Sequence, residues 1–227
     1  MLEVMAKSPQ MFNPIPDNCK LFLPLWHDEL RGGVFSSADD FRHVCTVTGT
    51  TWGSTGRTFN GSSAKIVIAS NAAWQNLTSK SVIIWYKAPG FTGTYRQLYN
   101  GYFGTAPYGD EIWFRYDANW GRIQVKNTAG DAEYGEWTHV PDTWTMLSYS
   151  WNGTNIRFWK DVTELTGVLH GGVFGGTMAC STGGLMLGVL LATLWFGGII
   201  GEVRVYNRAL SQAEITSIYD ETKFRFP

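Results

Sequence analysis

Aromatic and planar polar side chains gather between residues 95 and 127, and this combination is typical of sugar-binding surfaces. Aromatic rings cover the apolar faces of a sugar, while carboxylates, amides and guanidinium groups bond to its hydroxyls. The candidate ligand-binding residues are Trp113, Arg115, Asp117 and Gln124 in a hairpin expected over residues 111–127, with Tyr99, Tyr102 and Tyr108 in the loop before it. Tyr and Trp are also enriched at protein interfaces, so the same residues suit a protein partner equally well.

Carboxylates could also cleave a sugar, but their spacing here argues against that chemistry. Glycoside hydrolysis needs an acid and a second carboxylate that flank one bond. Glu111 and Asp117 are the nearest pair on one strand face, and a strand separates residues six apart by about 20 Å. The four histidines, at positions 27, 43, 139 and 170, come with no nucleophile motif. We therefore expect a protein that is not an enzyme.

The element that must present the candidate residues is a hairpin of two alternating strands. Residues 111–117 and residues 122–127 each alternate between apolar and mostly polar positions, and a turn at residues 118–121 separates them. Ile112 and Ile123 then face a core, while the polar positions and Trp113 face outward. The hairpin is therefore expected to display one polar, aromatic face to a ligand.

Composition favours one all-β domain. The chain has 227 residues, of which 44% are hydrophobic and only 16% charged, so a large core is available. Twenty-six Gly and eight Pro separate short runs rich in β-branched and aromatic residues, as turns separate strands. The net charge of −1 comes without any block of one sign, which excludes nucleic acid as an expected partner.

Further strands follow from apolar runs and from turn dipeptides. The expected strands outside residues 111–127 are residues 20–26, 57–59, 64–69, 81–87, 145–151, 155–160 and 201–206. Asn-Gly pairs at residues 60–61 and 152–153 are hairpin-type turns. One helix is expected near the end, because Ser211 and Glu214 have capping-box spacing and Ile215 and Ile218 share a face.

The segment 183–200 has two interpretations. It carries no charged residue over eighteen positions, which is long enough for a membrane span. The alternative is two buried strands, near residues 185–187 and 196–205, joined by a short apolar connection. We favour the strands, because the glycines suit turns and bulges and the rest of the chain already predicts a sandwich.

Residues 198–215 (GIIGEVRVYNRALSQAEI) resemble the closing strand and helix of the laminin G-like family, where a pattern close to G-x-I-[DG]-E-V-R-[IV]-Y-N-R-A-L-S-x-x-E-I recurs. Upstream, residues 21–26, 56–61, 81–87 and 144–161 resemble the strands and hairpins of that family in the same order. The resemblance spans about residues 20–222. It implies a concanavalin A-like jelly roll, in which two antiparallel sheets pack face to face with one short C-terminal helix.

This resemblance divides the chain into an N-terminal arm, residues 1–19, and a sandwich domain, residues 20–227. The superfamily contains lectins, pentraxins, laminin modules and glycoside hydrolases, so fold alone does not choose a function. Family members often hold Ca²⁺ between an early acidic loop and the closing strand. By that resemblance the metal-ligating candidates are Asp39, Asp40 and Glu202. The early loop departs from the family pattern, and Gly201 replaces an acidic residue.

Two functional hypotheses remain open. In the first, the chain is a lectin-like module that binds a glycan or a protein surface. In the second, it is a structural or decoration subunit of a virion or another surface assembly, and residues 1–18 dock on a neighbouring subunit. Both place it outside the cell or on a virion surface, although residues 1–16 do not resemble a signal peptide. The three cysteines, at positions 19, 45 and 180, allow at most one disulfide, and pairing of Cys19 with Cys45 stays open.

Overall fold

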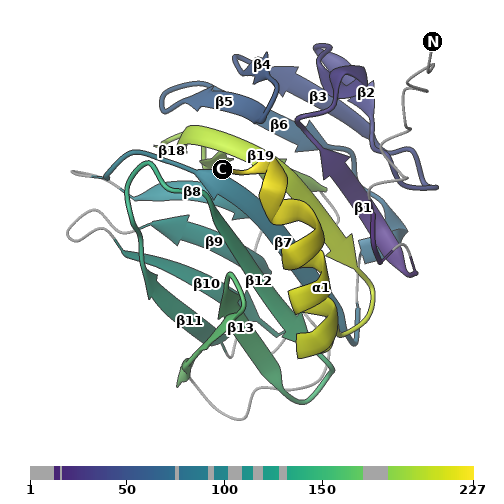
Figure 1. Cartoon of the computed structure of the whole chain (residues 1–227), viewed down its shortest axis with the longest axis vertical. Helices are drawn as coiled ribbons and strands as arrows, with labels where there is room; N and C mark the ends of the chain where they lie inside the picture. The colour runs from purple at the N-terminus through teal and green to yellow at the C-terminus, as the bar shows by residue number, and fades with distance from the viewer. Residues whose placement is uncertain are drawn as a thin grey trace.

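The computed structural model describes residues 13–15, 17–74, 77–91, 95–101, 109–114, 120–127, 132–170 and 184–227. Within these residues the strands form two antiparallel sheets that pack face to face, and a single α-helix lies across the outer face of one sheet (Figure 1). The expected concanavalin A-like sandwich is therefore confirmed.

The first sheet has eight strands among the described residues, in the order β14-β13-β12-β7-β19-β5-β4, and β1 also pairs with β19. Its strands are β1 (Cys19–Pro24), β4 (Thr51–Gly53), β5 (Gly56–Asn60), β7 (Lys80–Lys87), β12 (Thr145–Trp151), β13 (Ile156–Lys160), β14 (Thr163–Leu165) and β19 (Gly197–Tyr206). Because β19 is ten residues long, its first part pairs with β5 and its second part with β1, while β7 runs along the other side.

The second sheet has eleven strands in the described part of the chain, in the order β15-β11-β10-β9-β8-β16-β6-β3-β2, with the β17–β18 hairpin attached to β8. Its strands are β2 (Val34–Ser36), β3 (Val44–Thr48), β6 (Lys65–Ile68), β8 (Arg96–Asn100), β9 (Asp110–Phe114), β10 (Trp120–Lys126), β11 (Ala132–Thr138), β15 (Gly167–His170), β16 (Leu185–Leu187), β17 (Val189–Leu190) and β18 (Leu194–Trp195). Short 3₁₀ turns lie at Asp28–Leu30, Ala72–Trp74 and Lys223–Arg225.

The main core lies between the sheets and follows the period-two pattern of the strands. On the hairpin of β9 and β10, Ile112, Phe114, Ile123 and Val125 are fully buried in this core, so the predicted inward face is confirmed. Their neighbours along each strand consequently point outward. Burial of alternate side chains therefore fixes which residues of this hairpin can meet a ligand.

A buried ionic group joins the two sheets behind β9. The Asp110 carboxylate accepts from Lys80 Nζ at 2.9 Å, from the Tyr99 hydroxyl at 2.8 Å and from the Tyr149 hydroxyl at 2.5 Å. Burial alone would raise the pKa of Asp110, but the Lys80 charge and these hydrogen bonds outweigh it and lower that pKa. Lys80 and Tyr149 belong to the first sheet, so the group fixes β9 against it.

A second apolar cluster covers the outer face of the first sheet. The helix α1 (Gln212–Thr222) buries Ile215 and Ile218 there, beside Trp85 and Trp159. The predicted capping box is present at its start: Ser211 Oγ accepts from the Glu214 amide at 3.3 Å, and Glu214 accepts from the Ser211 amide at 2.8 Å. The helix therefore begins where the sequence pattern places it.

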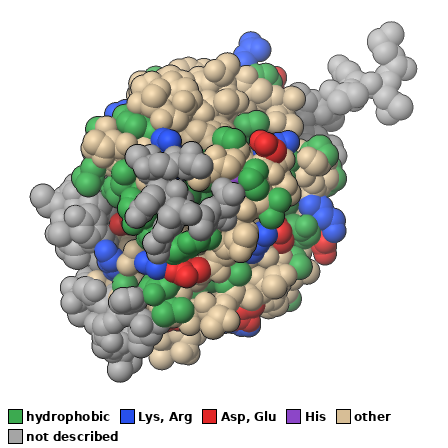
Figure 2. All heavy atoms as spheres, turned by 90° about the vertical axis from the view of Figure 1, so that its left-hand side faces the viewer, with side chains coloured by type: hydrophobic (Ala, Val, Ile, Leu, Met, Phe, Trp, Pro, Cys, Tyr) green, Lys and Arg blue, Asp and Glu red, His purple; other side chains and the backbone are tan. Residues whose placement is uncertain are grey.

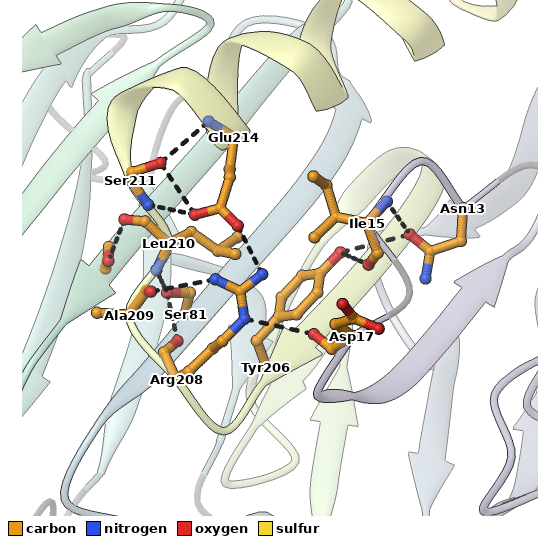
Figure 3. Close-up of polar contacts among 11 residues, drawn as sticks. Asn13, Ile15, Asp17, Ser81, Tyr206, Arg208, Ala209, Leu210, Ser211 and Glu214 are labelled. Carbon is orange, nitrogen blue, oxygen red and sulfur yellow. Dashed lines mark hydrogen bonds and ion pairs between the residues drawn. The ribbon is translucent and has the colours of Figure 1, made fainter.

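The segment before β1 docks on the sandwich of its own chain. Asn13 Oδ1 accepts from Arg204 Nη1 at 2.5 Å, and the Ile15 carbonyl accepts from the Tyr206 hydroxyl at 3.0 Å. Figure 3 shows Asn13, Ile15 and Tyr206 near the Arg208 side chain, which donates to the Asp17 carbonyl and to Glu214. The last residues of the expected N-terminal arm, residues 1–19, are therefore attached to β19.

The apolar segment that suggested a membrane span is built into the second and first sheets. Residues 185–187 form β16, and the strand expected near residues 196–205 is β19, as the strand interpretation predicts. In the part of the chain that the structure describes, no helix is long and apolar enough to cross a bilayer. The connection between these strands is itself a small hairpin, β17–β18, which the sequence pattern did not reveal.

Cys19 and Cys45 are free and buried in different clusters, so they do not pair with each other. Burial raises the pKa of each thiol to about 12. Neither thiol is therefore a nucleophile, and Cys180 lies outside the described residues.

Candidate functional site

A pocket of about 290 Å³ opens on the outer face of the second sheet. Strands β8, β9 and β10 form one part of it, and the β17–β18 hairpin forms another. The lining residues are Tyr95, Gln97, Glu111, Trp113, Gln124, Leu190 and Leu194. Its volume is at the small end of ligand pockets, which suits one sugar ring or a short end of a glycan.

Strand register brings these residues together from distant parts of the chain. Gln97 on β8 lies opposite Trp113 on β9, and Glu111 lies opposite Gln124 on β10. A parallel pairing of Trp195 with Gln97 then holds the β17–β18 hairpin against β8. Two of the candidates chosen from the sequence, Trp113 and Gln124, therefore line the same pocket.

The apolar part of the lining is aromatic on the sheet and aliphatic on the hairpin. Trp113 is half-buried, and the Tyr95 ring meets it edge to face with 5.2 Å between centroids. The ring centroid of Trp120 lies 6.4 Å from that of Trp113. Leu190 and Leu194 are also half-buried. An indole ring supported in this way offers a flat surface for the C–H face of a sugar.

The polar part of the lining consists of two amides and one carboxylate. Glu111 and Gln97 are almost fully buried, and Gln97 Nε2 donates to the Tyr99 carbonyl at 2.7 Å, which fixes its position. Burial raises the pKa of Glu111, and the nearby Asp110 charge adds to the rise. The Lys126 charge and a hydrogen bond with Gln97 offset part of that rise.

A cation lies next to the pocket but has its own partners. The Arg122 guanidinium stacks 3.8 Å above the Tyr134 ring centroid and lies 5.1 Å from the Trp113 centroid. Its Nε donates to Glu136 at 3.0 Å, so the charge is also paired. On the face drawn in Figure 2, basic and acidic side chains likewise lie interspersed among hydrophobic ones.

Among the described lining residues, the groups present are of the kinds that bind sugars. Glu111 is the single carboxylate among the described lining residues, whereas glycoside cleavage requires two on either side of the bond. An aromatic ring, two amides and a carboxylate supply stacking and hydroxyl bonding without that chemistry. The geometry of this pocket therefore suits binding.

The family model for the concanavalin A-like lectin/glucanases superfamily matches residues 59–216, which is more than half of the chain. The chain belongs to this superfamily. The match includes every strand that lines the pocket. No curated protein matches the sequence closely enough to count as a relative.

Solved structures that contain a part with the same fold include binding domains and an enzyme. The botulinum neurotoxin serotype D ligand binding domain, in complex with N-acetylneuraminic acid, has a TM-score of 0.71 and 10% identity over 90% of this chain and 51% of that chain. The binding domain of botulinum neurotoxin DC, in complex with rat synaptotagmin II, has a TM-score of 0.67 and 11% identity over 91% of this chain and 52% of that chain. Trypanosoma rangeli sialidase has a TM-score of 0.68 and 13% identity over 92% of this chain and 33% of that chain. The chain thus spans about half the length of the neurotoxin domains, and identities this low show a shared fold alone.

One candidate aromatic residue does not lie where the sequence suggested. Tyr99 was expected in a surface loop, but it belongs to β8, is fully buried, and donates its hydroxyl to Asp110. A bulge between Gln97 and Tyr99 shifts the register with β9 at this point. Gln97 faces the pocket instead. Arg115, Asp117, Tyr102 and Tyr108, the other ligand-binding candidates, lie outside the described residues.

Two of the three metal-ligating candidates, Asp39 and Glu202, have structural partners, and Asp40 is exposed. Asp39 accepts from the amides of Phe22 and Phe41, both at 2.9 Å, and Asp40 is exposed at the start of the same turn. Glu202 is buried and pairs with Arg204 at 2.7 Å. Among the described residues, no group of three or more His, Cys, Asp or Glu side chains could hold a metal ion. The structure thus does not join these carboxylates into one site, and a Ca²⁺ site stays a prediction.

Sequence reasoning missed several lining residues for two reasons. Tyr95 precedes the bulged strand β8 and Gln97 lies within it, and the residues of this strand (RQLYN) show no polar–apolar alternation that would separate the strand from its loop. Leu190 and Leu194 reach the pocket through a pairing between residues almost one hundred positions apart. No local pattern encodes such a contact.

Proposed function

We propose that this chain is a non-catalytic carbohydrate-binding module whose ligand occupies the pocket beside Trp113. One observation carries the proposal: an aromatic ring, two buried or half-buried amides and a buried carboxylate from three adjacent strands converge on a single pocket. Each of these groups has a defined role toward a sugar, since the ring covers a C–H face and the polar groups bond to hydroxyls.

The fold gives further support. The matched part makes up 51% of a neurotoxin ligand binding domain that was solved in complex with N-acetylneuraminic acid, so this sandwich occurs within a sugar-binding protein. The sialidase of similar fold belongs to a chain three times as long as the matched part, and its activity does not transfer to this chain. A module of this kind would act on glycans outside the cell.

Replacement of Trp113 by Ala tests the site. Truncation of a central aromatic anchor costs about 2 kcal/mol of binding free energy or more, which is about 30-fold in dissociation constant. Binding is measured on a glycan array and then by calorimetry with the glycans retained. Trp52→Ala is the matched control, because Trp52 is also half-buried on a strand but lies on β4 of the other sheet. Equal binding by both variants and the unchanged protein would place the sugar site elsewhere.

The assembly hypothesis remains a second proposal. The segment at Asn13 and Ile15 contacts β19 of its own chain, so these contacts compete with docking of the same residues on a neighbouring subunit. Docking through Asn13 and Ile15 would have to replace these contacts. Glycan binding and assembly are compatible on a virion surface, so the two proposals are tested separately.

A further inference from the structure

We infer that the pocket beside Trp113 selects uncharged sugars and rejects anionic ones, and that Glu111 is the residue that sets this preference. The inference rests on the proposed function and names the ligand class of the same site. It also separates this chain from the neurotoxin domain of similar fold, whose bound sugar is an acid.

The charge of the lining is the first step. Of the seven described residues that line the pocket, Glu111 alone is ionisable near neutral pH and carries a negative charge there. The remaining lining groups are two amides, two aromatic rings and two leucines. No cation is among the described lining residues, so within this lining a sugar carboxylate or sulfate would meet the Glu111 charge alone.

The fixed position of Glu111 is the second step. It lies between Asn100 on β8 and Gln124 on β10, in the middle of three paired strands. Only 7% of its surface is exposed, so the carboxylate cannot swing away from an incoming anion. The preceding residue, Asp110, forms an ion pair with Lys80 in the core. The Lys80 charge is therefore paired there and is not free to act on a ligand in the pocket.

The nearby cations are the third step. Arg122 is stacked on Tyr134 and paired with Glu136, and Arg96 donates to the carbonyls of Gly61 and Trp195. The Lys126 charge acts on Glu111 itself. Each of these cations is therefore engaged with groups of the protein.

The preference follows from these positions. A carboxylate accepts two hydrogen bonds from adjacent hydroxyls of a neutral sugar, and such charge-assisted bonds are strong. The same carboxylate repels a second anion, and the repulsion is larger in a partly desolvated pocket than in water. Glu111 thus attracts hydroxyls and excludes acids.

The test compares neutral glycans with the same glycans carrying a terminal sialic acid or a sulfate, for the unchanged protein and for Glu111→Gln. We expect the unchanged protein to bind the best neutral glycan at least about tenfold more tightly than its sialylated or sulfated form. Glu111→Gln should weaken the binding of neutral glycans and reduce the ratio between the affinities for neutral and acidic glycans, because Gln keeps the shape of the side chain and removes its charge. Glu133→Gln is the control, since Glu133 lies on the neighbouring strand β11 outside the lining.

A pH series on the unchanged protein gives a second readout if Glu111→Gln does not fold. Protonation of Glu111 should narrow the ratio for sulfated glycans as pH falls, with Lys126, Asp110 and Gln97 as the groups that set its titration. Tighter binding of acidic glycans, or a ratio that neither Glu111→Gln nor low pH changes, overturns the inference and leaves the sugar site in place. Failure to bind any glycan overturns the proposed function itself.

Discussion

Glu111 shows at the scale of one residue how binding chemistry and folding oppose each other. Its side chain is nearly buried, and burial raises its pKa above the usual value of 4.5 because the charged form loses solvent. A group whose pKa rises on folding stabilises the protein below its unfolded pKa and loses that contribution as pH rises through its folded pKa. At neutral pH the ionised Glu111 therefore costs stability.

Glu111→Gln is expected to raise the free energy of unfolding at pH 7. The gain should shrink as pH falls and disappear below the ordinary glutamate pKa, where the native residue is protonated in both states. Urea unfolding at pH 7 and pH 4 measures both values. A variant that is less stable at pH 7 would mean that Lys126 and Gln97 outweigh the burial of the carboxylate.

At the scale of elements, sequence patterns predicted the helix start and the hairpin, whose contacts join residues that are close in sequence. The capping box at Ser211 and the hairpin β12–β13 formed as expected, because both use contacts within a few residues. The bulge in β8 and the β17–β18 hairpin were not predictable, since the first depends on pairing with β9 and the second on pairing with β8. The pocket needs both, so sequence identified Trp113 and Gln124 but not the residues around them.

Ser211→Ala tests the predicted start of α1. Loss of the cap should reduce the free energy of unfolding by about 1 kcal/mol. Ser217→Ala is the control, because Ser217 lies in the middle of the same helix and bonds to Glu221 on the surface. Equal stability of the two variants would show that the cap contributes nothing beyond packing of Ile215 and Ile218.

At the scale of the whole molecule, the two faces of the sandwich have different roles. α1 and the segment around Asn13 cover the outer face of the first sheet and bury a second apolar cluster. The outer face of the second sheet carries the pocket. Composition and turn spacing predicted a sandwich, yet which face stays open depends on how the chain ends pack, and that is a long-range property.

Removal of residues 1–12 keeps Asn13 and Ile15, so the bonds of these two residues to Arg204 and Tyr206 should persist. Removal of residues 1–18 should lower the free energy of unfolding by about 2 kcal/mol or more, because the buried Arg204 loses its bond to Asn13 and Tyr206 loses its bond to Ile15. Light scattering of the shorter deletion tests assembly at the same time. A change of mass in that variant, with stability retained, would favour the assembly proposal.

The most direct test of a sugar site beside Trp113 is a crystal structure of the protein with a neutral oligosaccharide that it retains on an array. We predict density for one sugar ring against the Trp113 indole, with its hydroxyls bonded to Glu111 and Gln124 and its edge near Leu190. Density for the sugar on any other surface, with this pocket filled by water alone, would contradict the account.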